Sequence, residues 1–360
     1  MERKKTRAIK VGKLEIGGLS PITVQSMTNT DTRDAEATLD QVRQLEAAGC
    51  DIVRLAVFDN DCMKTIRTIK ESIQIPIVAD IHFDYRLAVA SIEYGIDKLR
   101  INPGNIGSVA GIENLVAAAK DRSVPIRIGV NAGSLKESLL SKYGNTPKAM
   151  AESALEHVKI LEDYGFYDIV ISLKASNVNK TIEAYRYISQ LVDYPLHLGV
   201  TEAGTTFSGI IKSSIGIGSL LADGIGDTIR VSLTASPLEE VKAGIEILKS
   251  LGLKKAGIEI ISCPTCGRCN IDLIGIANRL QEALSDVKYP IKLAVMGCVV
   301  NGPGEAKEAD IGIAGGKGQV ALFKKGKVVG SFPEESAFEV IMNEIQEMVE
   351  NGNFGNNPSL

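Results

Sequence analysis

Eight short apolar runs rich in β-branched residues, each followed by a segment with helical periodicity, constrain the fold of this chain more than any other feature. The runs are residues 22–25, 52–56, 77–80, 98–101, 126–130, 169–173, 196–200 and 228–231. Their starts lie about thirty residues apart on average, which is the length of one βα unit. Strict alternation of eight such units is typical of a closed (β/α)8 barrel of the TIM type.

The segments between the runs predict amphipathic helices. In the first segment, residues 35–48, Leu39, Val42 and Leu45 fall on one helical face, and Gly49 provides a stop. Further helices are expected over residues 63–72, 86–94, 112–121, 150–164, 178–191, 210–221 and 238–251. An open doubly wound sheet is the alternative, but no G-x-G-x-x-G motif follows the first strand, so the barrel is preferred.

With 360 residues, 44% of them hydrophobic, the chain is long enough for one large domain and a smaller one. We expect the barrel to occupy residues 1–251, opened by a hairpin over residues 8–16 that covers its bottom. Residues 258–350 predict a compact α+β domain, and residues 351–360 a disordered tail. The smaller domain is expected to contain strands over residues 258–261, 291–296, 311–314, 320–323 and 328–329 and helices over residues 271–283 and 334–350.

Polar side chains gather at the ends of the predicted strands, where barrel enzymes build their active sites. Four arginines lie within otherwise apolar strands, where an unpaired charge is costly: Arg54, Arg100, Arg127 and Arg230. The other polar residues of interest are Asp80, His82, Asn131, Lys174, Glu202 and Ser232. Arginines and a lysine that converge on one mouth indicate an anionic ligand, because guanidinium groups match phosphate oxygens. The alternative is structural ion pairing with Asp51, Asp80, Asp97 and Asp227.

Four of the six cysteines lie in two C-terminal motifs. Cys263, Cys266 and Cys269 stand in the stretch Ser-Cys-Pro-Thr-Cys-Gly-Arg-Cys, and Cys298 lies in a later loop. The C-x-x-C spacing lets two thiolates of one turn bind a single metal centre, and Cys298 offers a third soft ligand. A metal or iron–sulfur site is therefore the first hypothesis. Disulfides are disfavoured because no signal peptide is seen, and the isolated Cys50 and Cys62 are expected to fill core gaps.

The cysteine turn, followed by Met-Gly-Cys-Val-Val-Asn-Gly-Pro-Gly-Glu up to Glu305, stands behind a predicted eight-stranded barrel. In these motifs the chain resembles, over its whole length, the bacterial 4-hydroxy-3-methylbut-2-enyl diphosphate synthases of the non-mevalonate isoprenoid pathway. The resemblance implies an oxidoreductase that opens the ring of 2-C-methyl-D-erythritol 2,4-cyclodiphosphate and removes a hydroxyl, using two electrons from flavodoxin or ferredoxin. It also implies a [4Fe-4S] cluster held by Cys263, Cys266, Cys298 and Glu305, and a head-to-tail homodimer.

By position, the resemblance places the substrate contacts on polar residues already singled out at the strand ends. Those assigned to substrate binding are Arg54, Arg100, Arg127, Asn131, Lys174, Arg230 and Ser232. Glu202, Asp80 and His82 are assigned to catalysis, in which they position hydroxyl groups and deliver a proton.

Several alternatives stay open at this point. Cys269 extends the motif to C-x-x-C-x-x-C and could replace Glu305 as the fourth ligand. The four clustered cysteines could instead hold zinc in an accessory domain of a phosphate-binding barrel, although Glu305 would then have no role. A pure electron carrier is a third hypothesis, but it leaves the arginines of the barrel without a function.

Charge and hydropathy narrow the range of partners. A formal net charge of −4 argues against nucleic acid as the main partner, since neutralising phosphates requires a basic face. No apolar run reaches membrane-spanning length, so we expect a soluble, cytoplasmic enzyme. Four lysines are a candidate docking patch for an acidic electron donor, with a solvated hairpin face as the alternative: Lys317, Lys324, Lys325 and Lys327.

Overall fold

The computed structural model describes residues 2–102, 109–255, 257–285, 287–298 and 308–352. Glu305 and residues 353–360 of the predicted tail lie outside the described residues. The chain divides into two compact units, residues 1–254 and 255–360, with the boundary in the stretch between the two predicted domains. Within the described ranges, no helix is both long and apolar enough to cross a membrane.

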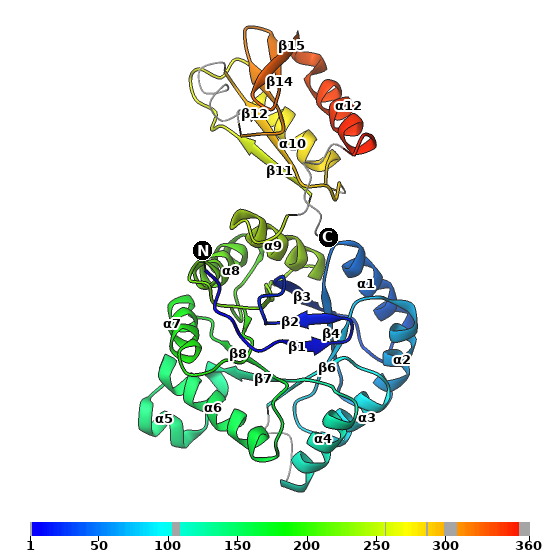
Figure 1. The fold of residues 1–360 in the computed structure, drawn as a ribbon, viewed down its shortest axis with the longest axis vertical. Helices are drawn as coiled ribbons and strands as arrows, with labels where there is room; N and C mark the ends of the chain where they lie inside the picture. The colour runs from blue at the N-terminus through cyan, green and yellow to red at the C-terminus, as the bar shows by residue number, and fades with distance from the viewer. Residues whose placement is uncertain (1, 103–108, 256, 286, 299–307, 353–360) are drawn as a thin grey trace. The chain divides into compact units, whose positions relative to one another are not determined.

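Eight parallel strands form the wall of a barrel in the first unit, which confirms the predicted fold class (Figure 1). They are β3 (Thr23–Met27), β4 (Ile52–Ala56), β5 (Ile77–Asp80), β6 (Lys98–Ile101), β7 (Ile126–Asn131), β8 (Ile169–Lys174), β9 (His197–Leu198) and β10 (Thr228–Ile229). Neighbouring strands follow the order β8-β7-β6-β5-β4-β3-β10-β9. A parallel bridge between Ile171 and Leu196 joins the two end strands and closes the ring.

Helices follow the strands and surround the wall (Figure 1). They are α1 (Ala35–Ala47), α2 (Cys62–Ser72), α3 (Tyr85–Glu93), α4 (Val109–Asp121), α6 (Pro147–Asp163), α7 (Val178–Ser189), α8 (Thr206–Ala222) and α9 (Pro237–Ser250). An additional helix, α5 (Glu137–Tyr143), lies between β7 and α6. The periodicity of the sequence does not predict α5, because 7 residues are too few to display a repeating apolar face.

Several helix starts are fixed by side chains that accept hydrogen bonds from otherwise free backbone N–H groups. Asp34 accepts from Ala37 at the start of α1, and Thr146 accepts from Ala149 at the start of α6. Because each cap stops the helix from extending backwards, the loop between a strand and its helix keeps its own conformation. These loops carry several of the polar residues singled out in the sequence.

The N-terminal hairpin covers the bottom of the barrel, where the strands begin, as predicted. β1 (Ile9–Val11) and β2 (Leu14–Ile16) pair in antiparallel fashion. Val11 and Ile16 pack against Ile52 and Val78, which lie early in β4 and β5, and all four side chains are fully buried. An apolar floor therefore seals the amino-terminal end of the barrel.

The second unit contains a five-stranded sheet in the order β11-β12-β13-β14-β15. Its strands are β11 (Ile258–Ser262), β12 (Ile291–Met296), β13 (Ile311–Gly315), β14 (Gln319–Lys324) and β15 (Lys327–Pro333), and its helices are α10 (Leu273–Ala283) and α12 (Ala337–Glu350). The first three strands are parallel and the last two antiparallel. Leu280 of α10 and Ile341 of α12 pack on Leu293 and Ile313 in one core, which confirms an α+β fold with its own hydrophobic centre.

Candidate active site

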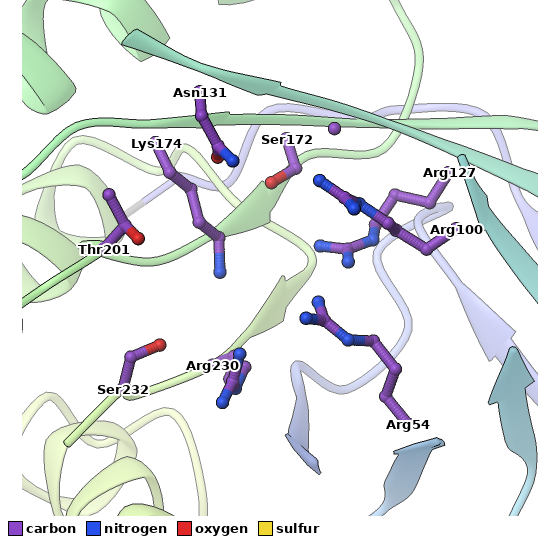
Figure 2. A pocket seen from close by; sticks show the side chains of 10 residues that line it. Arg54, Arg100, Arg127, Asn131, Ser172, Lys174, Thr201, Arg230 and Ser232 are labelled. Carbon is purple, nitrogen blue, oxygen red and sulfur yellow. The ribbon is translucent and has the colours of Figure 1, made fainter. Parts of the chain in front are cut away.

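A cavity of about 80 Å³ lies at the carboxyl ends of the barrel strands (Figure 2). Five of its lining side chains are cationic, and we refer to it as the cation cavity. The lining residues are Arg54, Arg100, Arg127, Gly129, Asn131, Ser172, Lys174, Thr201, Arg230 and Ser232. The structure thus brings all seven residues predicted to bind substrate together around one space.

The pleat of the strands explains this gathering, because every second residue of a strand points to the same side. β7 contributes Arg127, Gly129 and Asn131, and β8 contributes Ser172 and Lys174. The predicted site lacks three of the lining residues: Gly129, Ser172 and Thr201. Gly129 follows Arg127 by two residues and Ser172 precedes Lys174 by two, so the alternation along each strand could have identified both.

The cations of the cavity are crowded together and removed from water. Arg127 is only 1% exposed, and Lys174 is also buried. Burial, followed by the charges of Arg54 and Arg100, holds the pKa of Arg127 well below its usual range. Burial, followed by the charge of Arg127, likewise lowers the pKa of Lys174 far below its ordinary value. Such a group of cations is stabilised by an anion bound among them.

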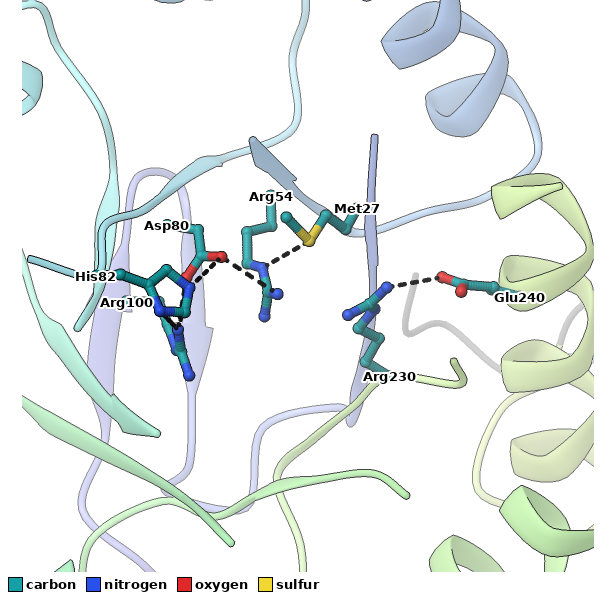
Figure 3. A network of polar contacts seen from close by, with 7 residues as sticks. All are labelled: Met27, Arg54, Asp80, His82, Arg100, Arg230 and Glu240. Atoms are coloured by element: carbon teal, nitrogen blue, oxygen red, sulfur yellow. Dashed lines mark hydrogen bonds and ion pairs between the residues drawn. The ribbon is translucent and has the colours of Figure 1, made fainter. Parts of the chain in front are cut away.

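Asp80 is the carboxylate that holds part of this group in place (Figure 3). Its oxygens lie 3.5 Å from Arg54 Nη2, 3.1 Å from Arg100 Nη1 and 3.3 Å from His82 Nε2. Burial by itself would raise the pKa of Asp80, but the Arg54 charge, the hydrogen bond from His82 and the Arg100 charge outweigh it, so the pKa lies well below its ordinary value. Asp80 is therefore a permanent carboxylate that orients its three neighbours.

Arg230 has a separate partner, which the sequence did not reveal. Its Nη2 lies 3.5 Å from Glu240 Oε2 on α9 (Figure 3). Glu240 also accepts hydrogen bonds from Ser26 Oγ at 3.2 Å and from the Leu233 backbone N–H at 3.0 Å.

Three of the four aspartates considered as ion-pair partners for the cavity arginines form ion pairs with other residues. Asp51 pairs with Lys254, Asp97 with Lys70 and Asp227 with Arg3.

Two glycines leave room for the cationic side chains. A Cβ added at Gly129 would lie 2.7 Å from Arg100 Nε, and one added at Gly199 would lie 2.7 Å from Lys174 Nζ. Both separations are too short for real atoms, so any larger residue would displace the cation beside it.

We expect Gly129→Ala to lower kcat/KM roughly ten- to a hundredfold, because a shift of about 1 Å in a positioning group can cost this much. The change is to be measured by steady-state kinetics together with thermal unfolding. Gly133→Ala is the matched control, since a Cβ there meets nothing within 4 Å. Equal activity of the two variants would contradict a positioning role for Gly129.

Glu202 and His82 lie in loops that follow barrel strands rather than on the wall. Glu202, after β9, is exposed and has φ +52°, a left-handed conformation that is uncommon for a residue other than glycine. Such conformations concentrate at functional sites. The side chain of His82 is 52% exposed, while its ring contacts Asp80 and Arg100. Both residues are thus accessible at the end of the barrel that carries the cation cavity.

In the second unit, the two cysteine motifs emerge from the same edge of the sheet. β11 and β12 are parallel, with Ser262 opposite Val295, so the turn that begins at Cys263 and the Gly297–Cys298 segment leave together. The Gly297 backbone N–H donates to Cys263 Sγ at 3.2 Å, and a Cβ on Gly297 would lie 2.6 Å from Cys269 Sγ. Gly297 therefore leaves room for the Cys269 sulfur and donates a backbone hydrogen bond to the Cys263 sulfur.

The donor set at this edge is chemically suited to an iron–sulfur cluster. None of the four cysteines forms a disulfide in the described part of the chain, and Cys266 is exposed while Cys298 is buried. In the part of the chain that the structure describes, no three ligand side chains lie close enough to hold a metal ion, and Glu305 lies outside that part. Thiolates are nevertheless the ligands that hold such clusters, and the close approach at Gly297 fits them. Cys50 and Cys62, by contrast, are buried in the barrel core, as predicted.

The candidate lysine patch does not form one surface beside the cysteines. Lys324 and Lys327 lie opposite each other in the strand register, on either side of the β14–β15 turn. Lys324 also lies opposite Ile311, at the start of β13. The cysteine motifs follow the ends of β11 and β12, at the other edge of the sheet. Lys317, next to the end of β13, is the member of the patch on the cysteine side. In addition, Lys324 pairs with Glu344.

Two family models match this chain. The model described as GcpE TIM-barrel domain matches residues 6–245, and the model described as GcpE protein C-terminal domain matches residues 259–347. Together they span both units of the structure.

Curated relatives match over almost their whole length. A protein of Caldanaerobacter subterraneus subsp. tengcongensis is 62% identical over 348 residues, which cover 96% of this chain and 98% of the relative. A protein of Clostridium perfringens is 60% identical over 347 residues, with coverage of 96% and 99%. Both are named 4-hydroxy-3-methylbut-2-en-1-yl diphosphate synthase (flavodoxin). Among solved structures, the dihydropteroate synthase of Yersinia pestis is similar in fold alone, with a TM-score of 0.50, 12% identity and coverage of 68% and 98%.

Proposed function

This chain belongs to the GcpE family, and we infer from that membership that it forms 4-hydroxy-3-methylbut-2-en-1-yl diphosphate in the non-mevalonate isoprenoid pathway. It is an oxidoreductase that opens the ring of 2-C-methyl-D-erythritol 2,4-cyclodiphosphate and removes a hydroxyl, with flavodoxin as electron donor. The assignment of individual residues to this reaction is our proposal.

The observation that carries the proposal is the cation cavity. The substrate is a small cyclic dianion, and the cavity offers five cations around one space, three of them buried: Arg54, Arg100, Arg127, Lys174 and Arg230. Guanidinium forks bind phosphate oxygens in pairs, which fixes the orientation of the ring as well as its charge. Asn131 and Ser232 add neutral donors for the remaining oxygens. In this proposal Asp80 and Glu240 hold the arginines in place while the substrate binds.

Removal of the hydroxyl as water requires a proton, and Glu202 is the proposed donor. It is exposed in a loop beside the strand ends, and its carboxyl group can exchange protons with solvent between turnovers. His82 lies between Asp80 and Arg100 and is proposed to position a substrate hydroxyl through its ring nitrogens. Asp80, as a permanent carboxylate, orients these groups and gives up no proton.

We propose that Cys263, Cys266, Cys298 and Glu305 hold a [4Fe-4S] cluster. When bound, such a cluster supplies electrons for the reduction of the substrate. The three thiolates anchor it, and an oxygen ligand such as Glu305 is more easily exchanged than a thiolate. Cys269 remains the alternative fourth ligand. Cysteines held as cluster ligands rather than as disulfides are suited to a reducing compartment, and the proposed location is accordingly the cytoplasm.

The cation cavity and the cysteine motifs belong to different compact units, but the proposed reaction requires both to reach one substrate. We therefore propose a head-to-tail homodimer in which the cysteine unit of one subunit serves the barrel of its partner. Symmetric dimers are the commonest assemblies of soluble proteins.

The test of the function is anaerobic purification followed by absorption spectroscopy, iron and sulfide analysis, and turnover with the cyclic diphosphate. We expect a brown protein with about four iron atoms per chain, bleached by dithionite and active with reduced flavodoxin. A colourless protein that contains zinc and does not turn over would refute the redox function.

A further inference from the structure

Beneath the cation cavity, the barrel contains a second layer of polar side chains that the proposed function does not use. Lys98 precedes Arg100 by two residues on β6, and Thr228 precedes Arg230 by two on β10. Gln25 of β3 and His197 of β9 are further buried polar side chains of the barrel, and each of these four residues is at most 1% exposed. Across the described ranges, Lys98 Nζ, the Gln25 amide, both His197 ring nitrogens and Thr228 Oγ1 have no hydrogen-bond partner.

Lys98 is the most demanding member of this layer. A buried ammonium group requires an anion or several hydrogen-bond acceptors beside it. Where these are absent, burial favours the neutral amine, and the group loses its proton. The charged groups that face Lys98 are cations, Arg127 of β7 and Arg54 of β4. His197 adds a third basic group, and the nearby carboxylate, Asp80, is already engaged by Arg54, Arg100 and His82.

Burial, and then the charges of Arg127 and Arg54, hold the pKa of Lys98 well below its ordinary value. This agrees with the geometric argument that the side chain is a neutral amine in the protein without substrate. Because no acceptor is fixed on Lys98 among the described residues, nothing in the barrel itself favours its protonation.

Substrate binding would place negative charge near Lys98, where the protein alone places positive charge. The cyclic diphosphate carries one negative charge on each phosphorus and has no group that titrates near neutral pH. In the cation cavity it would contact Arg100, and Lys98 lies two residues further down the same strand, roughly 7 Å along β6. Inside a water-poor barrel, a dianion at such a distance acts strongly on a neighbouring amine.

We propose that Lys98 takes up a proton when the cyclic diphosphate binds above it, so that the barrel supplies an additional positive charge only while the substrate is present. This inference rests on the proposed function. It makes Lys98 a positioning residue that acts through charge, without direct contact with the substrate.

The sign of the pH dependence follows from linkage. The pKa of Lys98 is higher in the complex than in the free protein, so a proton is bound on association at pH values between the two. In that window the association constant falls about tenfold for each unit by which the pH rises, per proton taken up. The substrate itself contributes nothing to this slope, because its phosphates stay ionised throughout.

Calorimetric titration of the anaerobic full-length protein with the cyclic diphosphate, in two buffers of different ionisation enthalpy, counts the protons. We expect Lys98→Met to take up about one proton fewer than the wild type and to show a correspondingly flatter pH dependence of affinity. Lys10→Met is the matched control, since Lys10 is exposed on β1, and it should behave as the wild type. Thermal unfolding checks the fold, and Lys98→Met should be as stable as the wild type or more so, because an unpaired buried amine is removed.

Equal proton uptake by the wild type and Lys98→Met would overturn the proposal and assign the proton to another group, such as Lys174. If Lys98→Met does not fold, Lys98→Gln provides the same test, because its amide is polar but cannot gain a proton. A wild-type protein that does not bind the cyclic diphosphate would instead refute the proposed function, and the inference with it.

Discussion

Replacement of Cys298 by serine is expected to remove the bound iron and, with it, turnover. Cys298 is buried just after β12, next to Gly297, which leaves room for the Cys269 sulfur and donates a hydrogen bond to the Cys263 sulfur. A serine hydroxyl is a hard, weakly acidic ligand and does not replace a thiolate on iron. The loss should exceed the roughly hundredfold reduction in metal affinity that removal of an outer-shell partner causes. Iron and sulfide content and the visible absorption spectrum measure it directly.

Cys62→Ser is the matched control, because Cys62 is buried in the barrel core and its thiol contacts Asp59 Oδ1, a contact that serine can also make. It should retain the full iron content. Cys269→Ser separates the two candidate sets of cluster ligands. Iron content is retained in this variant if Glu305 is the fourth ligand and lost if Cys269 is. A Cys298→Ser protein with the spectrum of the wild type would show that the cluster ligands lie elsewhere.

Glu202→Gln is expected to lower kcat about a hundred- to ten-thousandfold, the range associated with loss of a general acid, while substrate affinity stays within a few-fold. Glutamine keeps the size and polarity of the side chain but has no proton to give. Because Glu202 is exposed and the cations of the cavity are untouched, the stability of the barrel should not change. Steady-state kinetics and calorimetric binding, measured on the same preparation, separate the two effects.

Glu183→Gln, an exposed substitution on α7, is the control and should leave kcat unchanged. Unchanged turnover in Glu202→Gln would remove Glu202 from the proton path.

The two inactive variants, Cys298→Ser and Glu202→Gln, also test the head-to-tail dimer. If subunits exchange freely, a mixture of Cys298→Ser and Glu202→Gln chains should regain about a quarter of wild-type activity, because half of the dimers then contain one site with both parts intact. No recovery after exchange would contradict the shared site.

Much of the fold follows from the sequence because the barrel repeats one local pattern. β4, β5 and β6 occupy the predicted residues, since each is a buried run with clear turn signals on both sides. β9 and β10 are shorter than predicted, with two residues each. At Gly199 the chain passes so close to the Arg230 carbonyl oxygen that a Cβ would lie 2.6 Å from it, and such an approach between distant segments leaves no periodic signal.

The site could be predicted only where a single strand carries the evidence. Cations within apolar strands are visible locally, and the seven residues predicted to bind substrate do surround one cavity. Glu240 could not be found in this way. It stands beside Glu239 in the first turn of α9, where acidic residues are ordinary and mostly exposed, yet it is 5% exposed and pairs with Arg230. Its role depends on how α9 packs against β10 and β3.

The apolar floor formed by the N-terminal hairpin limits how substrate and product can enter and leave the barrel. Val11, Ile16, Ile52 and Val78 close the amino-terminal end, so both molecules have to use the end that carries the cation cavity. Substrate enters and product departs along the same route and cannot pass one another. Each catalytic cycle must therefore empty the barrel before the next begins, and the residence time of the product sets an upper limit on the rate.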